Sequence, residues 1–136
     1  MNSQLRKLSP ILWTNDLAGT KHFYEDVLGF TGRSNFPDFI SLQRESVEVM
    51  FVDPQRDAQD CLNDQSQQTP FLSGSLFILT SAVDDLWNSV RSRAIIKNAL
   101  ADREYLMRDF SILDNNGYEL VFGEDISSGQ HATKQV

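Results

Sequence analysis

Few side chains in this chain are of the types that bind catalytic metals or act as nucleophiles. His22 and His131 are the only histidines, and Cys61 is the only cysteine. His22 lies on the polar side of a predicted helix and His131 lies in a polar C-terminal segment, so we expect neither to be a metal ligand. Cys61 lies between Asp60 and Asp64, where negative charge disfavours a reactive thiolate. The sequence therefore favours neither a histidine-based metal site nor a cysteine nucleophile.

Two glutamates lie at equivalent positions of a repeated segment. Residues 39–51 align with residues 110–122 without a gap, and the alignment places Glu48 on Glu119. Two carboxylates on one face of a sheet can bind a cation or act as a base. The alternative is that both are solvated carboxylates at strand ends. The alignment also matches three apolar pairs, which are Phe39 with Phe110, Leu42 with Leu113, and Phe51 with Phe122.

The elements that would position these residues follow one order in both halves of the chain. In the first half, residues 8–14 predict a strand, and Asn15 or Asp16 offers a helix N-cap. Apolar residues at helical spacing continue as far as Leu28, and Gly29 is typical of the residue that ends a helix. Three strands are then predicted at residues 31–35, 38–44 and 47–53.

The second half repeats this order. A strand is predicted from about residue 74, and Ser81 or Asp84 is expected to cap a helix that contains Trp87. Three strands are predicted near residues 97–104, 107–113 and 118–123, with Asn115-Asn116-Gly117 as a hairpin turn.

We therefore predict an α+β protein built from two βαβββ modules. A single module would leave one sheet face uncovered, so the two modules are expected to pack together. The predicted boundaries are residues 8–54 for the first module, 55–73 for a long exposed connection, 74–125 for the second module and 126–136 for a polar tail.

The charge balance limits the partners of the protein. Its 136 residues include 12 basic and 19 acidic side chains, a net charge of −7, which disfavours nucleic acid and anionic lipid and favours cationic ligands. We expect no membrane partner, because no run of about 18 apolar residues is present. We also expect no signal peptide, because Met1–Lys7 is polar. A lone cysteine cannot form an internal disulfide, which favours the reducing cytoplasm.

Two segments give the chain a family resemblance. Asn15-Asp16-Leu17, followed by Phe-Tyr-Glu-Asp-Val-Leu-Gly-Phe at residues 23–30, resembles the opening signature of the vicinal oxygen chelate superfamily. This superfamily includes glyoxalases, bleomycin resistance proteins and extradiol dioxygenases. Residues 108–120 resemble its closing segment, with Asn115 in place of the usual proline. The resemblance covers about residues 8–125 and implies the glyoxalase/bleomycin resistance-type fold, in which curved mixed sheets surround a cavity.

Enzymes of this superfamily hold a divalent metal with one side chain from the first strand and one from the last strand of each module. The resemblance places these four positions at Ser9, Met50, Ser75 and Val121. None of them is a His, Asp or Glu, the side chains that a catalytic metal needs. Glu48 and Glu119 each lie two residues away, on the same face but about 6–7 Å along the strand. We therefore expect no metal and no other cofactor.

Strand alternation predicts which side chains share the cavity face with these positions. Trp13, Phe77 and Tyr105 are expected among them and can stack on a planar ligand, while a carboxylate can contact a cationic group. The alternative is that these side chains fill a closed core. The predicted ligand-binding residues are Trp13, Met50, Phe77, Tyr105, Met107, Asp109 and Val121.

Three functions are compatible with these observations. The first is a metal-free protein, similar to the bleomycin resistance branch, that sequesters an aromatic or cationic small molecule in an apolar cavity. The second is a divalent-metal-dependent lyase or dioxygenase of the same superfamily, and the third is a structural or regulatory protein with a filled cavity. The residue types at the four metal positions favour the first function. The resemblance also implies a homodimer, because members of the superfamily often complete a pocket by pairing modules between chains.

Overall fold

The structure is a computed structural model, and it describes residues 3–34, 36–54 and 72–128. The chain divides into two compact units, residues 1–71 and 72–136, which we describe separately as the first and the second module. Cys61, His131 and most of the predicted connection and tail lie outside the described residues. Within the described ranges, neither helix combines the length and the apolar character that crossing a membrane requires.

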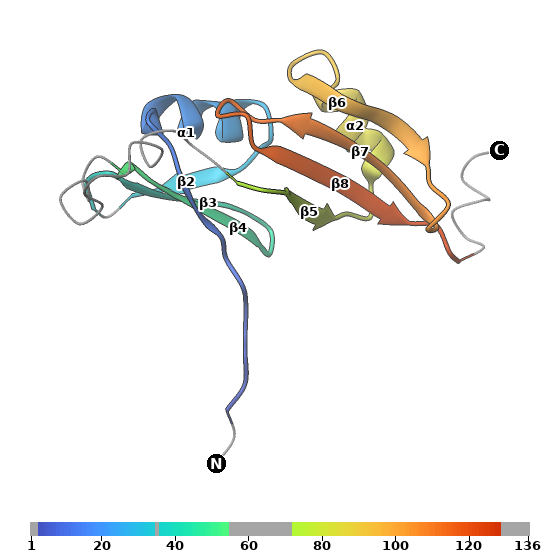
Figure 1. Cartoon of the computed structure of the whole chain (residues 1–136), viewed down its shortest axis with the longest axis horizontal. Helices are drawn as coiled ribbons and strands as arrows, with labels where there is room; N and C mark the ends of the chain where they lie inside the picture. Colours follow the sequence, from blue (N-terminus) through green and yellow to red (C-terminus); the bar gives the residue numbers. More distant parts are fainter. Residues whose placement is uncertain (1–2, 35, 55–71, 129–136) are drawn as a thin grey trace. The chain divides into compact units, whose positions relative to one another are not determined.

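The first module is a mixed four-stranded sheet with one helix across it (Figure 1). Its elements are β1 (Ile11–Trp13), α1 (Leu17–Asp26), β2 (Thr31–Arg33), β3 (Phe39–Arg44) and β4 (Val47–Val52). The strands lie in the order β1-β4-β3-β2, with β1 parallel to β4 and the other neighbours antiparallel.

The second module has the same architecture. Its elements are β5 (Ser75–Leu79), α2 (Val83–Val90), β6 (Ile95–Asp102), β7 (Met107–Leu113) and β8 (Glu119–Asp125). The strand order is β5-β8-β7-β6, again with one parallel pair, β5 and β8. The predicted α+β class with two βαβββ modules is therefore confirmed.

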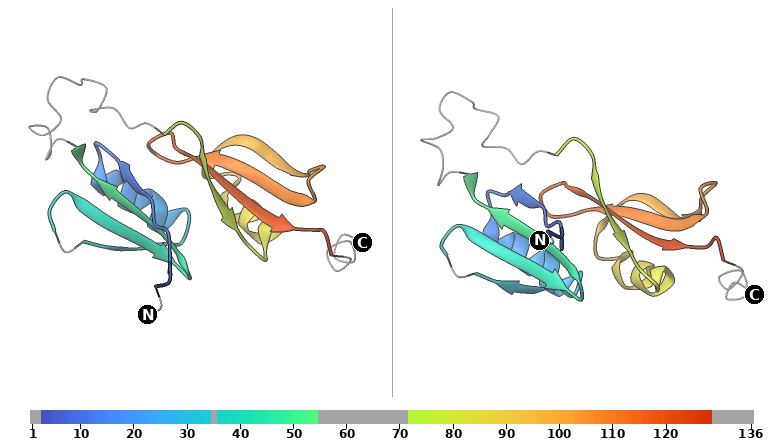
Figure 2. Two further views of the ribbon diagram at one scale, coloured as in Figure 1. Left: turned by 60° about the horizontal axis from the view of Figure 1, so that its bottom comes forward. Right: turned by 90° about the horizontal axis from the view of Figure 1, so that it is seen from below.

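Each sheet buries one face beneath its helix and leaves the other face open (Figure 2). In the first module, the ring of Tyr24 on α1 is fully buried and lies 5.4 Å from the rings of Phe30 and Phe51. In the second module, Trp87 of α2 lies 5.2 Å from the buried ring of Phe110. Because side chains alternate along a strand, the sequence neighbours of Phe51 and Phe110 point to the open faces.

Asp16 is the N-cap of α1, one of the two residues predicted for that position. Its Oδ1 accepts a hydrogen bond from the backbone N of Gly19 at 2.8 Å, which satisfies one of the unpaired donors of the first helical turn. Gly29 follows the helix with φ of +75°, a left-handed conformation that glycine adopts without steric cost. The predicted end of this helix is therefore confirmed.

Replacing Asp16 with alanine removes this cap. We expect the free energy of unfolding to fall by ~1 kcal/mol, the usual contribution of such a hydrogen bond. Urea unfolding monitored by circular dichroism measures the change. Lys21→Ala, at an exposed position of the same helix, is the matched control. Equal losses in the two variants would show that the cap contributes nothing.

The start of α2 differs from the prediction. The N-cap residue is Ala82, whose side chain has no acceptor atom for a capping hydrogen bond. Neither Ser81 nor Asp84 takes this role. Instead, Oε1 of Glu124 on β8 accepts a hydrogen bond from the backbone N of Val83 at 3.1 Å. A carboxylate from the neighbouring strand thus replaces the local cap, and its negative charge suits the positive end of the helix dipole.

The number of residues that separates equivalent positions of the two modules differs between their strand pairs. Met50 of β4 pairs with Ser41, whereas Val121 of β8 pairs with Ser111. Residues of β4 therefore match those of β8 at the predicted shift of 71, but β3 matches β7 at a shift of 70. The cause is the turn length, because residues 45–46 join β3 to β4 while the longer predicted turn at 115–117 joins β7 to β8.

This shift overturns part of the sequence alignment. Phe39 is equivalent to Asp109, so the matched pairs Phe39/Phe110 and Leu42/Leu113 are wrong. A slip of one residue exchanges the two faces of a strand. Phe110 is accordingly buried beneath α2, whereas Phe39 pairs with Val52 on the open face.

Candidate functional site

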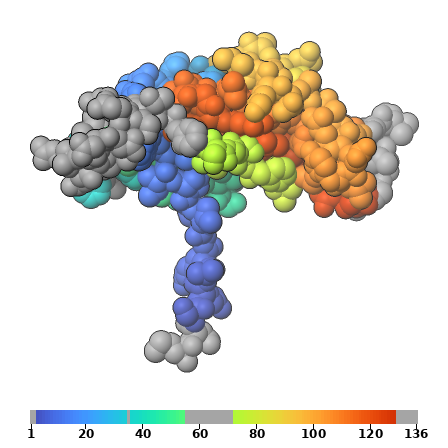
Figure 3. All heavy atoms as spheres, in the orientation of Figure 1, coloured from blue at the N-terminus to red at the C-terminus, as the bar shows by residue number. Residues whose placement is uncertain are grey.

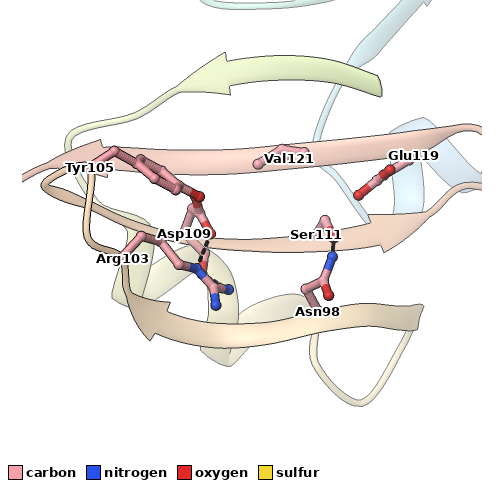
Figure 4. Close-up of a pocket in the computed structure, with 7 residues that line it drawn as sticks. All are labelled: Asn98, Arg103, Tyr105, Asp109, Ser111, Glu119 and Val121. Carbon is pink, nitrogen blue, oxygen red and sulfur yellow. Dashed lines mark hydrogen bonds and ion pairs between the residues drawn. The ribbon is translucent and has the colours of Figure 1, made fainter. Parts of the chain in front are cut away.

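The open face of the second sheet contains a hollow of about 320 Å³ (Figure 4). Its walls come from β6, β7, β8 and the turn that joins β6 to β7. The lining residues are Asn98, Arg103, Tyr105, Asp109, Ser111, Glu119 and Val121. Asp109 and Ser111 enter this hollow because they alternate with Phe110, which lies on the helix side of β7.

Asp109 is the centre of a hydrogen-bonded cluster at one end of the hollow. Its side chain is only 7% exposed, and its two carboxylate oxygens accept hydrogen bonds from Arg103 Nε at 2.7 Å and Tyr105 Oη at 2.8 Å. The hydrogen bond to Asp109 raises the pKa of Tyr105 above its ordinary value, because it stabilises the protonated phenol. Tyr105 therefore acts as a hydrogen-bond donor at neutral pH.

The turn between β6 and β7 brings this cluster together. Arg103 N donates to Met107 O at 2.7 Å and Leu106 N donates to Arg103 O at 3.0 Å, so the chain reverses within four residues. Leu106 has φ of +64°, an uncommon conformation for a residue with a branched side chain. A strained backbone conformation persists only where the surrounding structure holds it in place, and such conformations are often found beside functional sites.

The other end of the hollow holds neutral hydrogen-bonding groups and a second ion pair. Asn98 Nδ2 donates to Ser111 Oγ at 2.9 Å, and Lys97 Nζ lies 3.0 Å from Glu119 Oε1. The carboxylates of Asp109 and Glu119 are thus each paired with a cation. The hollow can orient a ligand through hydrogen bonds without presenting an unpaired charge.

The structure brings three of the predicted ligand-binding residues into this hollow, namely Tyr105, Asp109 and Val121. Phe77 and Met107 lie on the same face over Gly123, where an added Cβ would lie 2.8 Å from Phe77 Cζ and 3.0 Å from Met107 Cε. All the lining residues except Val121 carry a polar group, which differs from the expected apolar cavity.

Ser111 follows from the same alternation along β7 and Glu119 was weighed as one of the paired carboxylates, whereas Asn98 and Arg103 were not predicted. Asn98 lies where β6 shifts its register against β7, and such an irregularity has no clear sequence signal. The spacing of Arg103 and Asp109 across a hairpin turn was the available signal for their ion pair.

Trp13 and Met50, the remaining predicted residues, lie on the open face of the first sheet. Ile11 pairs with Met50 and Trp13 pairs with Val52, so these side chains form two neighbouring rows. Met50 alternates with the buried residues Val49 and Phe51, as strand periodicity requires.

Glu48 lies beside these rows and accepts hydrogen bonds from several side chains. It accepts hydrogen bonds from Ser9 Oγ at 2.8 Å, from Ser41 Oγ, and from Gln43 Nε2 at 3.2 Å, and it lies 2.9 Å from Lys7 Nζ. The hydrogen bond from Lys7, followed by those from the serines, lowers the pKa of Glu48 to about 2. Its side chain is 13% exposed, so it is not a solvated strand-end carboxylate.

The low pKa of Glu48 predicts that the free energy of unfolding depends on pH. Because the pKa falls from 4.5 to about 2 on folding, the stabilisation is complete above about pH 4.5 and is lost as the pH falls towards 2. We expect Glu48→Gln to flatten this part of the pH profile of urea unfolding. Glu45→Gln, which changes an 82% exposed side chain, is the control. Identical profiles for the wild type and Glu48→Gln would contradict the prediction.

The residues at the metal positions do not fit a divalent metal. Ser9 and Ser75 offer neutral hydroxyls, Met50 a thioether and Val121 no donor atom at all. Within residues 3–34, 36–54 and 72–128, no three His, Cys, Asp or Glu side chains are grouped so that they could hold a metal ion. His22 is 78% exposed on α1, 3.9 Å from Asp26.

Comparisons with known proteins agree with this architecture. A family model described as the Glyoxalase/Bleomycin resistance protein/Dioxygenase superfamily matches residues 7–122. No curated protein matches the sequence significantly.

Among solved structures, a glyoxalase/bleomycin resistance protein/dioxygenase from Nocardioides is 20% identical with a TM-score of 0.71, covering 95% of this chain and 89% of its own. A virulence protein from Salmonella typhimurium is 19% identical with a TM-score of 0.71, over 92% and 100%. A lactoylglutathione lyase from Agrobacterium tumefaciens is 17% identical with a TM-score of 0.66, over 90% and 96%. At these identities the likeness concerns the fold.

Proposed function

This chain belongs to the glyoxalase/bleomycin resistance protein/dioxygenase superfamily, and within it we propose that the protein binds an aromatic or cationic small molecule without a metal. The hollow on the second sheet is the proposed site. We also propose that the protein acts as a homodimer in the cytoplasm, as the family resemblance and the lone cysteine suggest.

The observation that carries this proposal is the chemistry of the four metal positions. A catalytic metal of this kind needs several imidazole or carboxylate ligands around an open coordination position. Ser9, Met50, Ser75 and Val121 do not supply them. Glu48 and Glu119 are close in sequence, but each already contacts a lysine.

The hollow supports a ligand with a flat body and polar edges. The ring of Tyr105 and the side chain of Val121 offer apolar contact, while Asn98, Ser111 and Arg103 offer hydrogen bonds. A few polar groups that fix orientation are typical of small-molecule sites. The net charge of −7 further favours a ligand with a positive charge through the long-range field of the protein.

A thermal-shift panel of aromatic and cationic molecules, repeated after treatment with EDTA, tests the proposal. We expect at least one compound to stabilise the protein equally with and without EDTA. Asn98→Ala should then weaken its binding roughly two- to tenfold, the effect of losing one hydrogen bond. Asn88→Ala, at an exposed position of α2, is the matched control. Stabilisation that disappears with EDTA would favour the metal-dependent lyase or dioxygenase instead.

A further inference from the structure

The Glu48 cluster consists only of residues of the first module, none of which lines the hollow of the second module. Three of its hydrogen-bond donors belong to the sheet or to the residues that lead directly into it. Ser41 and Gln43 lie on β3, and Ser9 comes two residues before β1. Strand register therefore fixes these donors around the carboxylate before any cation arrives.

The cation on Glu48 comes from a different kind of element. Lys7 belongs to residues 3–8, a segment without helix or strand in which every residue is exposed. Figure 3 shows the outer part of this segment, at the blue end of the colour scale, projecting from the surface. The Lys7 side chain is 51% exposed, whereas that of Glu48 is only 13% exposed. Because holding Lys7 on Glu48 orders a long and half-exposed side chain, this cost offsets part of the attraction between the two charges.

The second module shows the arrangement in which the cation is built in. Strand register makes three residues of its open face equivalent to members of the Glu48 cluster. Ser75 corresponds to Ser9, Ser111 to Ser41, and Glu119 to Glu48 itself. There the ammonium group comes from Lys97 on β6, a strand of the same sheet. In the first module, the ammonium group comes from the terminal segment and is therefore the replaceable part of the cluster.

The surroundings of Glu48 indicate what an incoming cation would carry. The next row of the open face along the strands is Ile11 beside Met50, and the row after that is Trp13 beside Val52. At about 3.3 Å per residue, these rows lie roughly 7 and 13 Å from Glu48. A molecule with an ammonium group on Glu48 would place its body on these apolar and aromatic side chains.

We propose that Glu48 and its sheet donors form a binding site for a primary ammonium group on an apolar or aromatic body. Lys7 holds this site in the absence of such an amine and is displaced from it when the amine binds. The site does not require the hollow of the second module to bind a ligand, so it goes beyond the function proposed above.

Calorimetric titration with 2-phenylethylamine at about pH 7 tests this site, with 2-phenylethanol as the uncharged probe of the same shape. We expect the amine to bind and the alcohol to bind at least about tenfold more weakly, because the alcohol lacks the charge-assisted hydrogen bond.

Glu48→Gln should weaken amine binding by a similar factor. Lys7→Met should tighten it roughly two- to fivefold, because an ion pair of ordinary strength no longer competes. Glu45→Gln, an equal change of charge in the neighbouring turn, should leave the affinity unchanged.

Three results would overturn the proposal. The first is an affinity that neither Glu48→Gln nor Lys7→Met alters. The second is no binding of the amine to the wild type or to Lys7→Met. The third is an affinity that falls in Asn98→Ala but not in Glu48→Gln, which would assign the amine to the hollow and leave the function proposed above intact.

Discussion

The Phe110→Ala variant is expected to lose about 3–5 kcal/mol of unfolding free energy. Phe110 is fully buried, its ring is stacked 5.4 Å from that of Phe122, and Trp87 of α2 lies against it at 5.2 Å. Truncation removes apolar contacts and leaves a cavity that the surrounding strands cannot fill completely. Urea unfolding monitored by circular dichroism gives the free energy directly.

Phe77→Ala is the matched control for this variant. It removes the same side chain from the open face of the same sheet, where Phe77 is 53% exposed. We expect its loss to stay below about 1.5 kcal/mol, because less apolar area returns to water. Similar losses in the two variants would mean that the open face is as well packed as the helix side, and that the alternation along β5 and β7 is misassigned.

The Asp109→Ala variant is expected to lose about 2–4 kcal/mol of unfolding free energy. The substitution removes the shared acceptor of Arg103 and Tyr105 and leaves a half-buried guanidinium without its carboxylate. The pKa of Tyr105 should also fall towards its ordinary value, because the hydrogen bond that stabilises the neutral phenol is lost. Ultraviolet titration of tyrosinate measures this second effect independently of unfolding.

Asp102→Ala is the control, because it removes a carboxylate whose cation keeps a second one. Asp102 is 43% exposed and lies 2.6 Å from Arg108, which also lies 3.2 Å from Asp84, so we expect a loss of about 0–1 kcal/mol. If Asp109→Ala is no worse than Asp102→Ala, the cluster around Asp109 contributes little to the second module. An unchanged Tyr105 titration in Asp109→Ala would show that the hydrogen bond between these residues is absent in solution.

Periodicity was sufficient to predict which side chains lie on which face of the last strands. Met50 alternates with Phe51, and Val121 alternates with Phe122, because one face must be buried beneath a helix and the other must not. The same reasoning placed Tyr105, Asp109 and Val121 together on the second sheet, where they line one hollow. Local rules also narrowed the cap of α1 to Asn15 or Asp16 and identified Gly29 as the residue that ends the helix.

Features that depend on turn length or on contacts distant in sequence could not be predicted in this way. One additional residue in the turn before β8 moves Phe110 to the opposite face from Phe39, although the sequence alignment matches them. Glu124 on β8 caps α2 although it lies 41 residues after Val83 in the sequence, a separation that no capping motif covers. The contact of Lys7 with Glu48 likewise depends on where the terminal segment passes the sheet.

Native mass spectrometry of freshly purified, untagged protein decides whether the protein works without a metal, because it reports subunit number, bound metal and retained small molecules together. We expect a dimer whose mass includes no stoichiometric metal and to which an aromatic or cationic compound binds in the presence of EDTA. Stoichiometric Ni, Zn, Fe or Mn in the purified protein would contradict this expectation, because metal-dependent chemistry would then be present despite Ser9, Met50, Ser75 and Val121.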